Sequence, residues 1–311
     1  MEQIAPREAY GKALIKLGDI NEKVVVLDAD VSKASMTYMF RDSYPERFFN
    51  LGISESDIVG TGAGFAIGGK IPFVNAYANF LLGNAWEQIR ISVCYANQNV
   101  KIIGHNIGAS SGKDGPTHLP FEDISLMRVL PNMMVIEPAD GIEMAKAVVA
   151  LAEHKGPAYL RVGRVPTPVV TKGEDVFEIG KANICREGED VTIIACGVML
   201  SKALSAAEGL SKEGISVEVI NLHTIKPLDK DTIMKSVRKT KGVVTAEEHT
   251  VIGGLGGAIS ELLGESYPVP IRMVGVRDRF GLCGTYDELH QLLGLTTENI
   301  IGCVKELINL K

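Results

Sequence analysis

The chain has 311 residues, of which 46% are hydrophobic and 23% are charged, and its formal net charge is −6. This length suggests about two domains, and the composition is that of a folded protein with enough apolar residues to build a core. The acidic balance argues against a general binder of nucleic acid or of an anionic membrane surface. No apolar run reaches the roughly 18 residues that span a bilayer, so we expect no membrane partner.

The start of the sequence and the cysteines indicate the compartment. Residues 1–10 are polar and contain Pro6, which is not the pattern of a secretory signal. The five cysteines are scattered and form no CxxC pair. Because their number is odd and their surroundings are apolar, we expect reduced thiols in a cytoplasmic protein.

In the first part of the chain, short apolar runs alternate with longer segments of helical spacing. Strands are predicted at 24–27, 101–103, 133–136 and 158–160, and helices at 7–17, 83–96 and 141–152. Pro6 stands near the first helical position, where its missing N–H costs nothing. This alternation predicts a parallel sheet that is covered by helices on both faces.

A break follows at 164–175, where Pro166, Pro168 and Gly173 interrupt any regular period, so this segment is predicted to be a linker. The alternation then resumes. Strands are predicted at 191–196, 217–220, 243–246 and 271–274, and helices at 200–212, 257–263 and 298–310. We therefore predict an α/β fold with two doubly wound domains, residues 1–172 and 173–311, each a mostly parallel sheet with helices on both faces.

The first segment that could carry chemistry is Asn-Leu-Gly-Ile-Ser-Glu at 50–55. A short strand at 48–51 leads through a turn into a helix that begins near Ser54, so Glu55 falls in the first helical turn. Ligands of doubly wound sheets bind at this carboxyl edge of the strands. A glutamate at this position can also simply complement the helix dipole, and the position alone leaves both readings open.

Two glycine clusters, at 60–69 and at 253–257, do not fit the GxGxxG spacing of a dinucleotide loop. The first lies within the helix that follows Glu55, where it indicates close helix packing. The second follows a strand, so it either places a helix N-terminus against an anion or forms a plain tight turn.

A long polar loop at 105–118, with the sequence HNIGASSGKDGPTH, carries His105, Asp114 and His118. Loops of this length inside a compact domain are usually functional, and these side chains offer donors and acceptors to a polyhydroxylated ligand. A metal site is the weaker alternative, because the two histidines are thirteen residues apart and have no cysteine partner. We predict no metal ligands in this chain, and a solvent loop without function remains the other alternative.

Arg161 and Arg164 follow the strand that ends at Leu160, where they could clamp a phosphate or pair with a nearby carboxylate. The chain lacks a GxxxxGK[ST] phosphate loop and a GxSxG nucleophile elbow. It also lacks a GDG with a distal asparagine, the motif that holds magnesium and diphosphate in thiamine enzymes.

Together these segments resemble transketolase over nearly the whole chain. The matching motifs are GISE at 52–55, an aromatic residue at Phe80, His105, DGPTH at 114–118, LPNM at 130–133, GPAYLRVGR at 156–164, TAEEH at 245–249 and DRFG at 278–281. DGPTH after an upstream histidine is the most specific, whereas GISE is shared with related thiamine enzymes. Full-length members have three domains, and this chain resembles the last two, the pyrimidine-binding and C-terminal domains. It thus resembles the C-terminal subunit of a split transketolase, with a cloned fragment as the alternative.

The resemblance implies thiamine diphosphate as the cofactor. Glu55 would bind N1′ of the aminopyrimidine and favour the imino tautomer, whose exocyclic nitrogen takes the proton from thiazolium C2. Phe80 and Trp86 would enclose the pyrimidine ring, with ordinary core packing as the alternative for both.

The resemblance also implies a substrate site. His105 and His118 would bind the sugar and act in catalysis beside Glu55. Asp114 would bind the C2 hydroxyl of the acceptor, and Arg164 and Arg7 would bind a phosphate group.

One residue departs from the family pattern. Asp28 stands where many transketolases have a serine that contacts the sugar phosphate, and its charge would repel a phosphate dianion. We therefore expect either a phosphate that is held differently, with Lys33 or Lys113 assisting, or an altered affinity for sugar phosphates.

The resemblance implies transfer of a two-carbon ketol group between sugar phosphates, as in the pentose phosphate pathway. Activity would require a separate N-terminal subunit that binds the diphosphate and Mg²⁺ or Ca²⁺, so the isolated chain is expected to bind the cofactor weakly. A dimer of this chain within a heterotetramer is expected. The alternatives are half of a deoxyxylulose-phosphate synthase, the beta subunit of an oxoacid dehydrogenase, and a non-catalytic regulatory partner. His105 with DGPTH favours transketolase over the first two.

Overall fold

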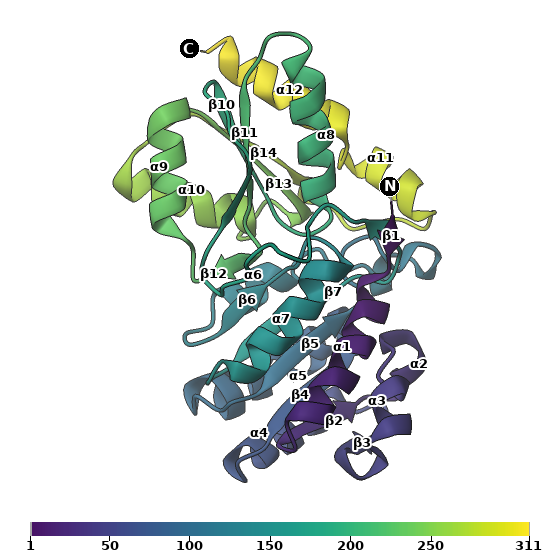
Figure 1. Cartoon of the computed structure of the whole chain (residues 1–311). Coiled ribbons are helices and arrows are strands. Elements are labelled where there is room, and N and C mark those ends of the chain that lie inside the picture. The colour runs from purple at the N-terminus through teal and green to yellow at the C-terminus, as the bar shows by residue number, and fades with distance from the viewer. Residues whose placement is uncertain (1, 311) are drawn as a thin grey trace.

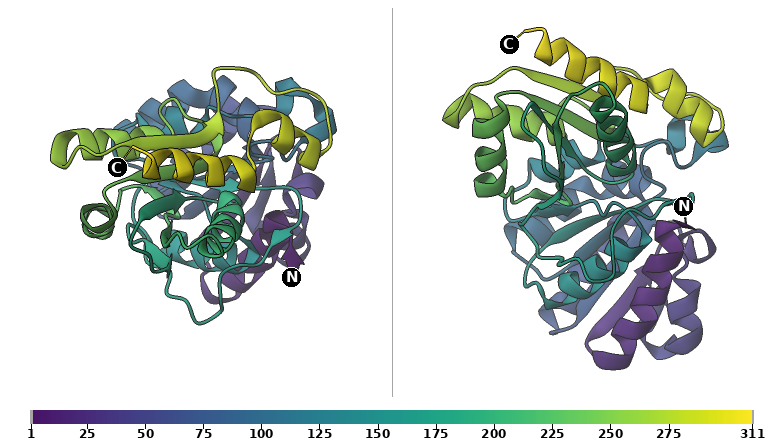
Figure 2. Two further views of the ribbon diagram at one scale, coloured as in Figure 1. Left: turned by 90° about the horizontal axis from the view of Figure 1, so that it is seen from above. Right: turned by 45° about the horizontal axis from the view of Figure 1, so that its top comes forward.

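The computed structural model describes residues 2–310, and its two large β-sheets lie one above the other along the molecule (Figure 1). The N-terminus lies near the junction of the two sheets, and the C-terminus lies at the far end of the second domain (Figure 2). Each sheet is mostly parallel and carries helices on both faces, so the predicted fold class is confirmed.

The first sheet has seven strands in the order β12-β6-β7-β5-β4-β2-β3, and only the edge strand β12 is antiparallel to its neighbour. The strands are β2 Val24–Asp28, β3 Phe48–Asn50, β4 Ile71–Tyr77, β5 Lys101–His105, β6 Met134–Ile136, β7 Ala158–Val162 and β12 Thr224–Lys226. Every residue of the central strands β2, β5 and β7 is buried, as expected for a parallel sheet between two helical layers.

Two apolar cores cover the two faces of this sheet. One face packs against α1 Pro6–Ile20, α3 Tyr38–Ser43 and α7 Gly141–Glu153, with the short α2 Ser32–Ser35 beside α1. The other packs against α4 Glu55–Ile67, α5 Ala78–Gln88, the π-helix η2 Ile89–Tyr95 and α6 Asp123–Arg128. Short 3₁₀ turns lie at η1 Pro45–Arg47, η3 Gly112–Asp114 and η4 Pro116–His118.

The second sheet has five strands in the order β14-β13-β10-β11-β9, with β9 antiparallel to β11. The strands are β9 Asn183–Arg186, β10 Val191–Ala195, β11 Val217–Asn221, β13 Val243–Thr250 and β14 Ile271–Val276. Helices α8 Met199–Ser211, α11 Tyr286–Leu293 and α12 Thr297–Ile308 pack in one core, and α9 Lys230–Thr240 and α10 Leu255–Ser266 pack in another.

The segment between the two sheets is tied to the first domain. Strands β1 Gln3–Ile4 and β8 Thr167–Pro168 form a small antiparallel ribbon, and the irregular chain that follows contains the predicted division at 172. Asp140, the N-cap of α7, also accepts hydrogen bonds from the backbone N–H groups of Val170 and Thr171, at 2.7 Å each. The second half of the chain also contributes to the first sheet, because its strand β12 pairs with β6.

The helix predicted at 83–96 differs from the structure. Helix α5 begins at Ala78, directly after β4, and Gly83 lies inside it with an exposed Cα. No Gly or Pro separates the strand from the helix, so the sequence carries no turn signal there. The consequence is that Phe80 lies on a helix and close to the end of a strand.

The register of the sheet brings the carboxyl ends of its strands into line. Asn50, Asp28 and Asn75 are neighbours across β3, β2 and β4. Two residues further along β4, Tyr77 pairs with His105 of β5. Residues from four distant parts of the sequence therefore meet at one edge of the sheet.

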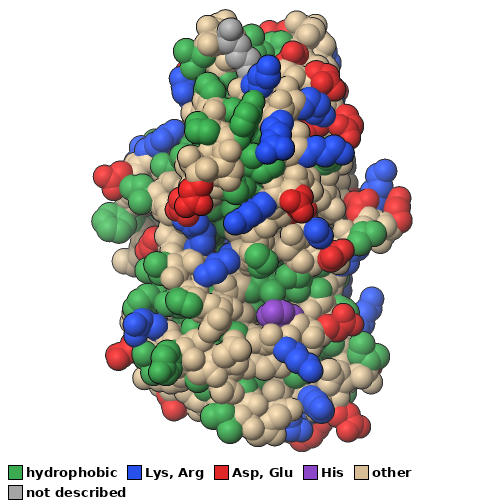
Figure 3. All heavy atoms as spheres, turned by 90° about the vertical axis from the view of Figure 1, so that its left-hand side faces the viewer, with side chains coloured by type: hydrophobic (Ala, Val, Ile, Leu, Met, Phe, Trp, Pro, Cys, Tyr) green, Lys and Arg blue, Asp and Glu red, His purple; other side chains and the backbone are tan. Residues whose placement is uncertain are grey.

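The surface carries charges of both signs. On the side drawn in Figure 3, lysine and arginine side chains are mixed with aspartate and glutamate rather than gathered in one field. Within residues 2–310, none of the helices is long and apolar enough to cross a membrane.

Candidate active site

Glu55 is the first residue of α4, just after β3, as the sequence predicts. Its side chain is mostly buried, with the residue 8% exposed, and the amide of Asn84 on α5 donates to Oε2 at 3.3 Å. The carboxylate therefore faces α5 at the edge of the sheet and retains lone pairs for a further donor.

Aromatic rings lie on the same side of α5 as Asn84. Phe80 precedes Asn84 by four residues, which places both on one face of the helix. The Phe80 ring lies 5.0 Å from the ring of His118, edge to face, and Tyr77 lies 6.2 Å from His118. The DGPTH loop thus packs its histidine against the aromatic residues at the end of β4. Tyr77 was missed by the sequence reasoning, although its place at a strand end beside Phe80 was a usable signal.

Trp86 is not brought together with Phe80. Six residues along an α-helix correspond to a rotation of about 240° from Phe80. Trp86 instead packs against the core, and its indole N–H donates to the carbonyl of Leu126 on α6 at 3.3 Å. Its position corresponds to the core-packing alternative.

His105, the last residue of β5, is held in one tautomer by its neighbours. The Nδ2 atom of Asn75 donates to the carbonyls of Leu27 and Phe73, so Oδ1 of Asn75 is an acceptor. This oxygen accepts from Tyr10 Oη at 2.6 Å and lies 3.0 Å from His105 Nε2, which must therefore carry a hydrogen. Burial, and secondarily the charge of Arg7, lowers the pKa of His105 to about 3. The ring is neutral near pH 7, and its Nδ1 atom is a hydrogen-bond acceptor.

Several buried polar atoms at this edge have no hydrogen-bond partner within residues 2–310. They are Nε of Arg7, Nδ1 of His105, both amide atoms of Asn106 and Oγ of Ser111. Buried polar atoms are nearly always paired, so a cluster of such atoms marks a place where a polar ligand can bind. Asn106 and Ser111 were not singled out from the sequence, since a loop position alone does not reveal burial.

Asp114 and the two predicted phosphate-binding arginines lie near one another. Arg164 donates to Asp114 Oδ2 at 2.8 Å, and both side chains are about two-fifths exposed, at 38% and 43%. Burial, followed by the positive charge of Arg164, lowers the pKa of Arg7. Two guanidinium groups that repel each other in this way form a site suited to an anion.

Arg161 does not belong to this site, so its interpretation as half of a phosphate clamp is wrong. Its side chain is fully buried and pairs with Asp123 at 2.7 Å and with Glu137. The alternating direction of side chains along β7 turns Arg161 inward, toward α6 and the second domain.

Asp28 is also turned away from solvent. Its carboxylate accepts from the backbone of Val31 and the hydroxyl of Thr37, at 2.6 Å each, and from the hydroxyl of Ser35 at 3.1 Å. Burial raises the pKa of Asp28, and these hydrogen bonds oppose that shift. The carboxylate shapes the turn before α2 and is not an exposed charge.

The second glycine cluster places a helix N-terminus against a carboxyl group, and that group is a side chain of this protein. Glu247 of β13 accepts from the backbone N–H groups of Leu255 and Gly256, at 2.6 and 2.8 Å. A Cβ atom at Gly254 would lie 2.1 Å from Glu247 Oε2, so this glycine is required by the contact. Burial raises the pKa of Glu247 to about 8.

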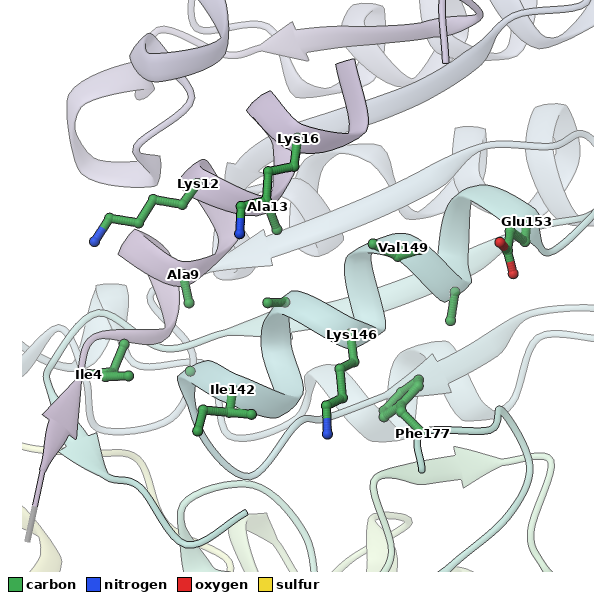
Figure 4. A pocket seen from close by; sticks show the side chains of 13 residues that line it. Ile4, Ala9, Lys12, Ala13, Lys16, Ile142, Lys146, Val149, Glu153 and Phe177 are labelled. Carbon is green, nitrogen blue, oxygen red and sulfur yellow. The ribbon is translucent and has the colours of Figure 1, made fainter. Parts of the chain in front are cut away.

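A cavity of 720 Å³ lies elsewhere, between α1 and α7 (Figure 4). Its walls include Ala9, Ala13 and Val149, and the side chains of Lys12 and Lys16 extend from α1. None of the residues described above at the carboxyl edge lines it, so we assign the candidate site to the carboxyl edge of the first sheet.

The donor set at this edge fits half of a thiamine cofactor. Glu55 and Phe80 offer a carboxylate and an apolar wall to a pyrimidine ring. Within residues 2–310, however, no group of three or more His, Cys, Asp or Glu side chains is arranged to hold a metal ion. The carboxylate and the aromatic wall therefore fit the pyrimidine end of the cofactor.

Comparison with known proteins gives a matching family for each part of the chain. Residues 2–168 match the family "Transketolase, pyrimidine binding domain", and residues 180–300 match "Transketolase, C-terminal domain". The chain is 42% identical over 305 residues to the 6-deoxy-6-sulfo-D-fructose transketolase subunit SqwH of Clostridium sp. (strain MSTE9), covering 98% of this chain and 95% of that protein. It is 35% identical over 306 residues to a subunit of the apulose-4-phosphate transketolase of Phocaeicola vulgatus, covering 98% of each.

A solved structure described as "Split gene transketolase, inactive beta4 tetramer" has a TM-score of 0.93 and 47% identity, covering 99% of each chain. The fold and the edge site thus define an α/β protein with a pyrimidine-binding domain followed by a C-terminal domain. The chain belongs to the transketolase family, and it matches the C-terminal subunits of split transketolases over their length.

Proposed function

We propose that this chain is the catalytic C-terminal subunit of a split transketolase. It transfers a two-carbon ketol group between sugars that carry a terminal anionic group. The observation that carries the proposal is the position of Glu55, a mostly buried carboxylate beside Asn84, at the same sheet edge as His105 and Asp114.

Thiamine diphosphate, when bound, supplies the nucleophilic carbon and the electron sink that ketol transfer requires. Glu55 holds a proton at ring atom N1′, and Phe80 packs against the ring. The carboxylate is well suited to this task, because its exposure is low and its one hydrogen bond within residues 2–310 comes from an amide rather than from a cation.

The sugar is bound by the loop and by the arginines. His105 is neutral and accepts a hydrogen bond from a sugar hydroxyl at Nδ1. Asp114 and His118 bind hydroxyls at the more exposed lip of the site, and Arg7 and Arg164 bind the terminal anion. The relatives' names refer to a sulfosugar and to a sugar phosphate, which supports a sulfonate or a phosphate as that anion. Asp28 is buried and accepts three hydrogen bonds from neighbouring groups, so its oxygens are not presented to the anion.

A second chain completes the cofactor site. The match of this chain to the pyrimidine-binding and C-terminal families, and to subunits of split transketolases, supports binding of Mg²⁺ or Ca²⁺ and of the diphosphate by a separate N-terminal subunit. The expected assembly is a heterotetramer with two copies of each chain. The relative described as an inactive beta4 tetramer supports the inference that this chain alone is not active.

The test is to mix this chain with a chain that carries the diphosphate-binding domain and to assay ketol transfer with thiamine diphosphate and Mg²⁺. A sugar phosphate and a sulfosugar donor are assayed in parallel. Activity is expected in the mixture and in neither chain alone. A mixture that assembles but transfers nothing from either donor would support the non-catalytic alternative.

A further inference from the structure

The loop at 106–121, which carries Asp114 and His118, is held by the second domain. The backbone N–H of Thr250 donates to the carbonyl of Phe121 at 2.7 Å, and the N–H of Ala109 donates to Glu248 Oε1 at 3.2 Å. Both Glu248 and Thr250 belong to β13. One strand of the second domain therefore fixes the loop near both of its ends.

Glu248 is itself held by two further residues of the second domain. His290 Nε2 on α11 lies 2.7 Å from Glu248 Oε1, and Lys202 Nζ on α8 contacts His290 Nδ1. The ammonium of Lys202 is a donor only, so His290 accepts at Nδ1 and donates from Nε2 to Glu248. Hydrogen bonds thus connect Lys202 to His290 and His290 to Glu248, and the same Glu248 oxygen also accepts from the backbone N–H of Ala109.

The middle of the loop is fixed by close packing. A Cβ atom at Gly115 would lie 2.7 Å from Cys283 Sγ, and a Cβ atom at Gly112 would lie 3.0 Å from the carbonyl of Gly284. Both Gly112 and Gly115 also have positive φ, at 51° and 83°. The second domain therefore limits the shape of the turn on each side of Asp114.

We propose that Glu248 is a positioning residue for ketol transfer, oriented by His290 and Lys202, and that it holds the loop in the shape that brings His118 to Phe80. This inference rests on the proposed function. The loop carries Asp114 and His118, which are proposed to bind the substrate, whereas Glu55 and Phe80, which are proposed to bind the cofactor ring, lie outside it. By holding the loop, the second domain therefore has a role in substrate binding.

Lys202 is the most informative residue to change. It is half-buried, borders a 560 Å³ cavity and reaches the loop through His290 and Glu248. The Lys202→Met variant keeps the aliphatic stem and removes the donor. Lys212→Met, at the exposed end of the same helix, is the matched control.

The assay compares steady-state kinetics in the complex with the diphosphate-domain chain. We expect Lys202→Met to raise KM for the sugar about tenfold, since a charged hydrogen bond is lost, while the affinity for thiamine diphosphate stays unchanged. Lys202→Arg should restore most of the loss, and Lys212→Met should match the wild type. Equal loss of cofactor and sugar affinity would contradict a positioning role.

Amide hydrogen exchange gives a readout that does not depend on activity. In the isolated chain, residues 106–121 should exchange faster in Lys202→Met and in Glu248→Gln than in the wild type, while α1 and α7 are unchanged. Folded variants with unchanged exchange in this loop and unchanged KM would overturn the proposal. If the wild-type complex transfers no ketol group, the proposed function fails. Hydrogen exchange in residues 106–121 still decides whether Lys202 holds this loop in place.

Discussion

The Nε2 atom of His105 lies 3.0 Å from Oδ1 of Asn75, and this contact determines which ring nitrogen carries the hydrogen. Because Asn75 uses its amide N–H groups on two backbone carbonyls, the direction of the bond to His105 is fixed. The other ring nitrogen, Nδ1, is then an acceptor. The proposed role of His105 follows, because a free acceptor at a buried strand end can receive a hydrogen bond from a sugar hydroxyl.

The neutral state of His105 predicts a pH dependence of stability. Its pKa is about 3 in the folded chain and near 6.5 when unfolded, so the unfolded state binds more protons between these values and stability falls as the pH falls below about 6.5. From pH 7 to pH 5 this group alone should remove about 2 kcal/mol from the free energy of unfolding. Urea denaturation of His105→Gln should show a pH dependence that is shallower by that amount.

His223 provides the control for this measurement. It is buried outside the candidate site, stacks on Phe177 with a centroid distance of 4.2 Å, and burial lowers its pKa to about 4. His223→Gln should flatten the pH dependence of stability to a similar degree and leave ketol transfer unchanged, whereas His105→Gln should impair transfer. Equal effects of the two variants on transfer would contradict the assignment of His105.

Substitutions of Arg161 and Arg164 should have different effects, one mainly on stability and the other mainly on substrate binding. Arg161→Met leaves the buried carboxylates of Asp123 and Glu137 without their cation, and we expect a loss of about 3–5 kcal/mol in the free energy of unfolding. Arg164→Met removes an exposed pair with Asp114, so stability should change by less than about 1 kcal/mol. Chemical denaturation of the two variants measures the difference.

In kinetic assays the order of the two variants should be reversed, with Arg164→Met affecting substrate binding more than Arg161→Met does. Arg164→Met is expected to raise KM for a sugar phosphate about tenfold or more, because a charge-assisted hydrogen bond to the anion is lost. An uncharged sugar of the same length serves as the control substrate and should be much less affected. A wild-type KM of the Arg164→Met enzyme for the phosphorylated sugar would show that Arg164 does not bind the anion.

Gly115→Ala should reduce ketol transfer through the shape of the loop. The new methyl group would meet Cys283 Sγ, and alanine is strained at a φ of 83°. Gly302→Ala is the matched control, since this glycine lies within α12 with nothing within 4 Å of a Cβ and should gain roughly 0.5–1 kcal/mol of stability. Kinetics and thermal unfolding of both variants test the contrast, and a fully active Gly115→Ala enzyme would show that the loop tolerates another shape.

Much of the fold follows from local patterns. The buried runs at 24–27 and 158–160 became β2 and β7 because continuous apolar stretches fit the centre of a parallel sheet. The start of α4 at Glu55 was also predictable from the turn before it. The start of α5 was not, because no Gly or Pro marks the passage from β4, and β12 could not be assigned to the first sheet from its position in the sequence.

The site was predictable where motifs are contiguous and not where it depends on packing. His105, Asp114 and His118 lie close together in the sequence, at 105–118, so the sequence could single them out as candidates. Asn75 and Tyr10 come together with His105 only because β4 pairs with β5 and α1 packs on the sheet. The inward direction of Arg161 likewise depends on the neighbouring carboxylates, which lie far away in the sequence.

The central claim is that Glu55 acts on a cofactor ring at a junction with a second chain. The most direct measurement is ketol transfer by the wild-type chain and by Glu55→Gln, each assembled with the same diphosphate-domain chain. Because a proton-holding carboxylate contributes about 10²–10⁴-fold to such reactions, we predict a loss of at least about 100-fold in kcat with assembly intact. A Glu55→Gln complex with wild-type kcat would contradict the account.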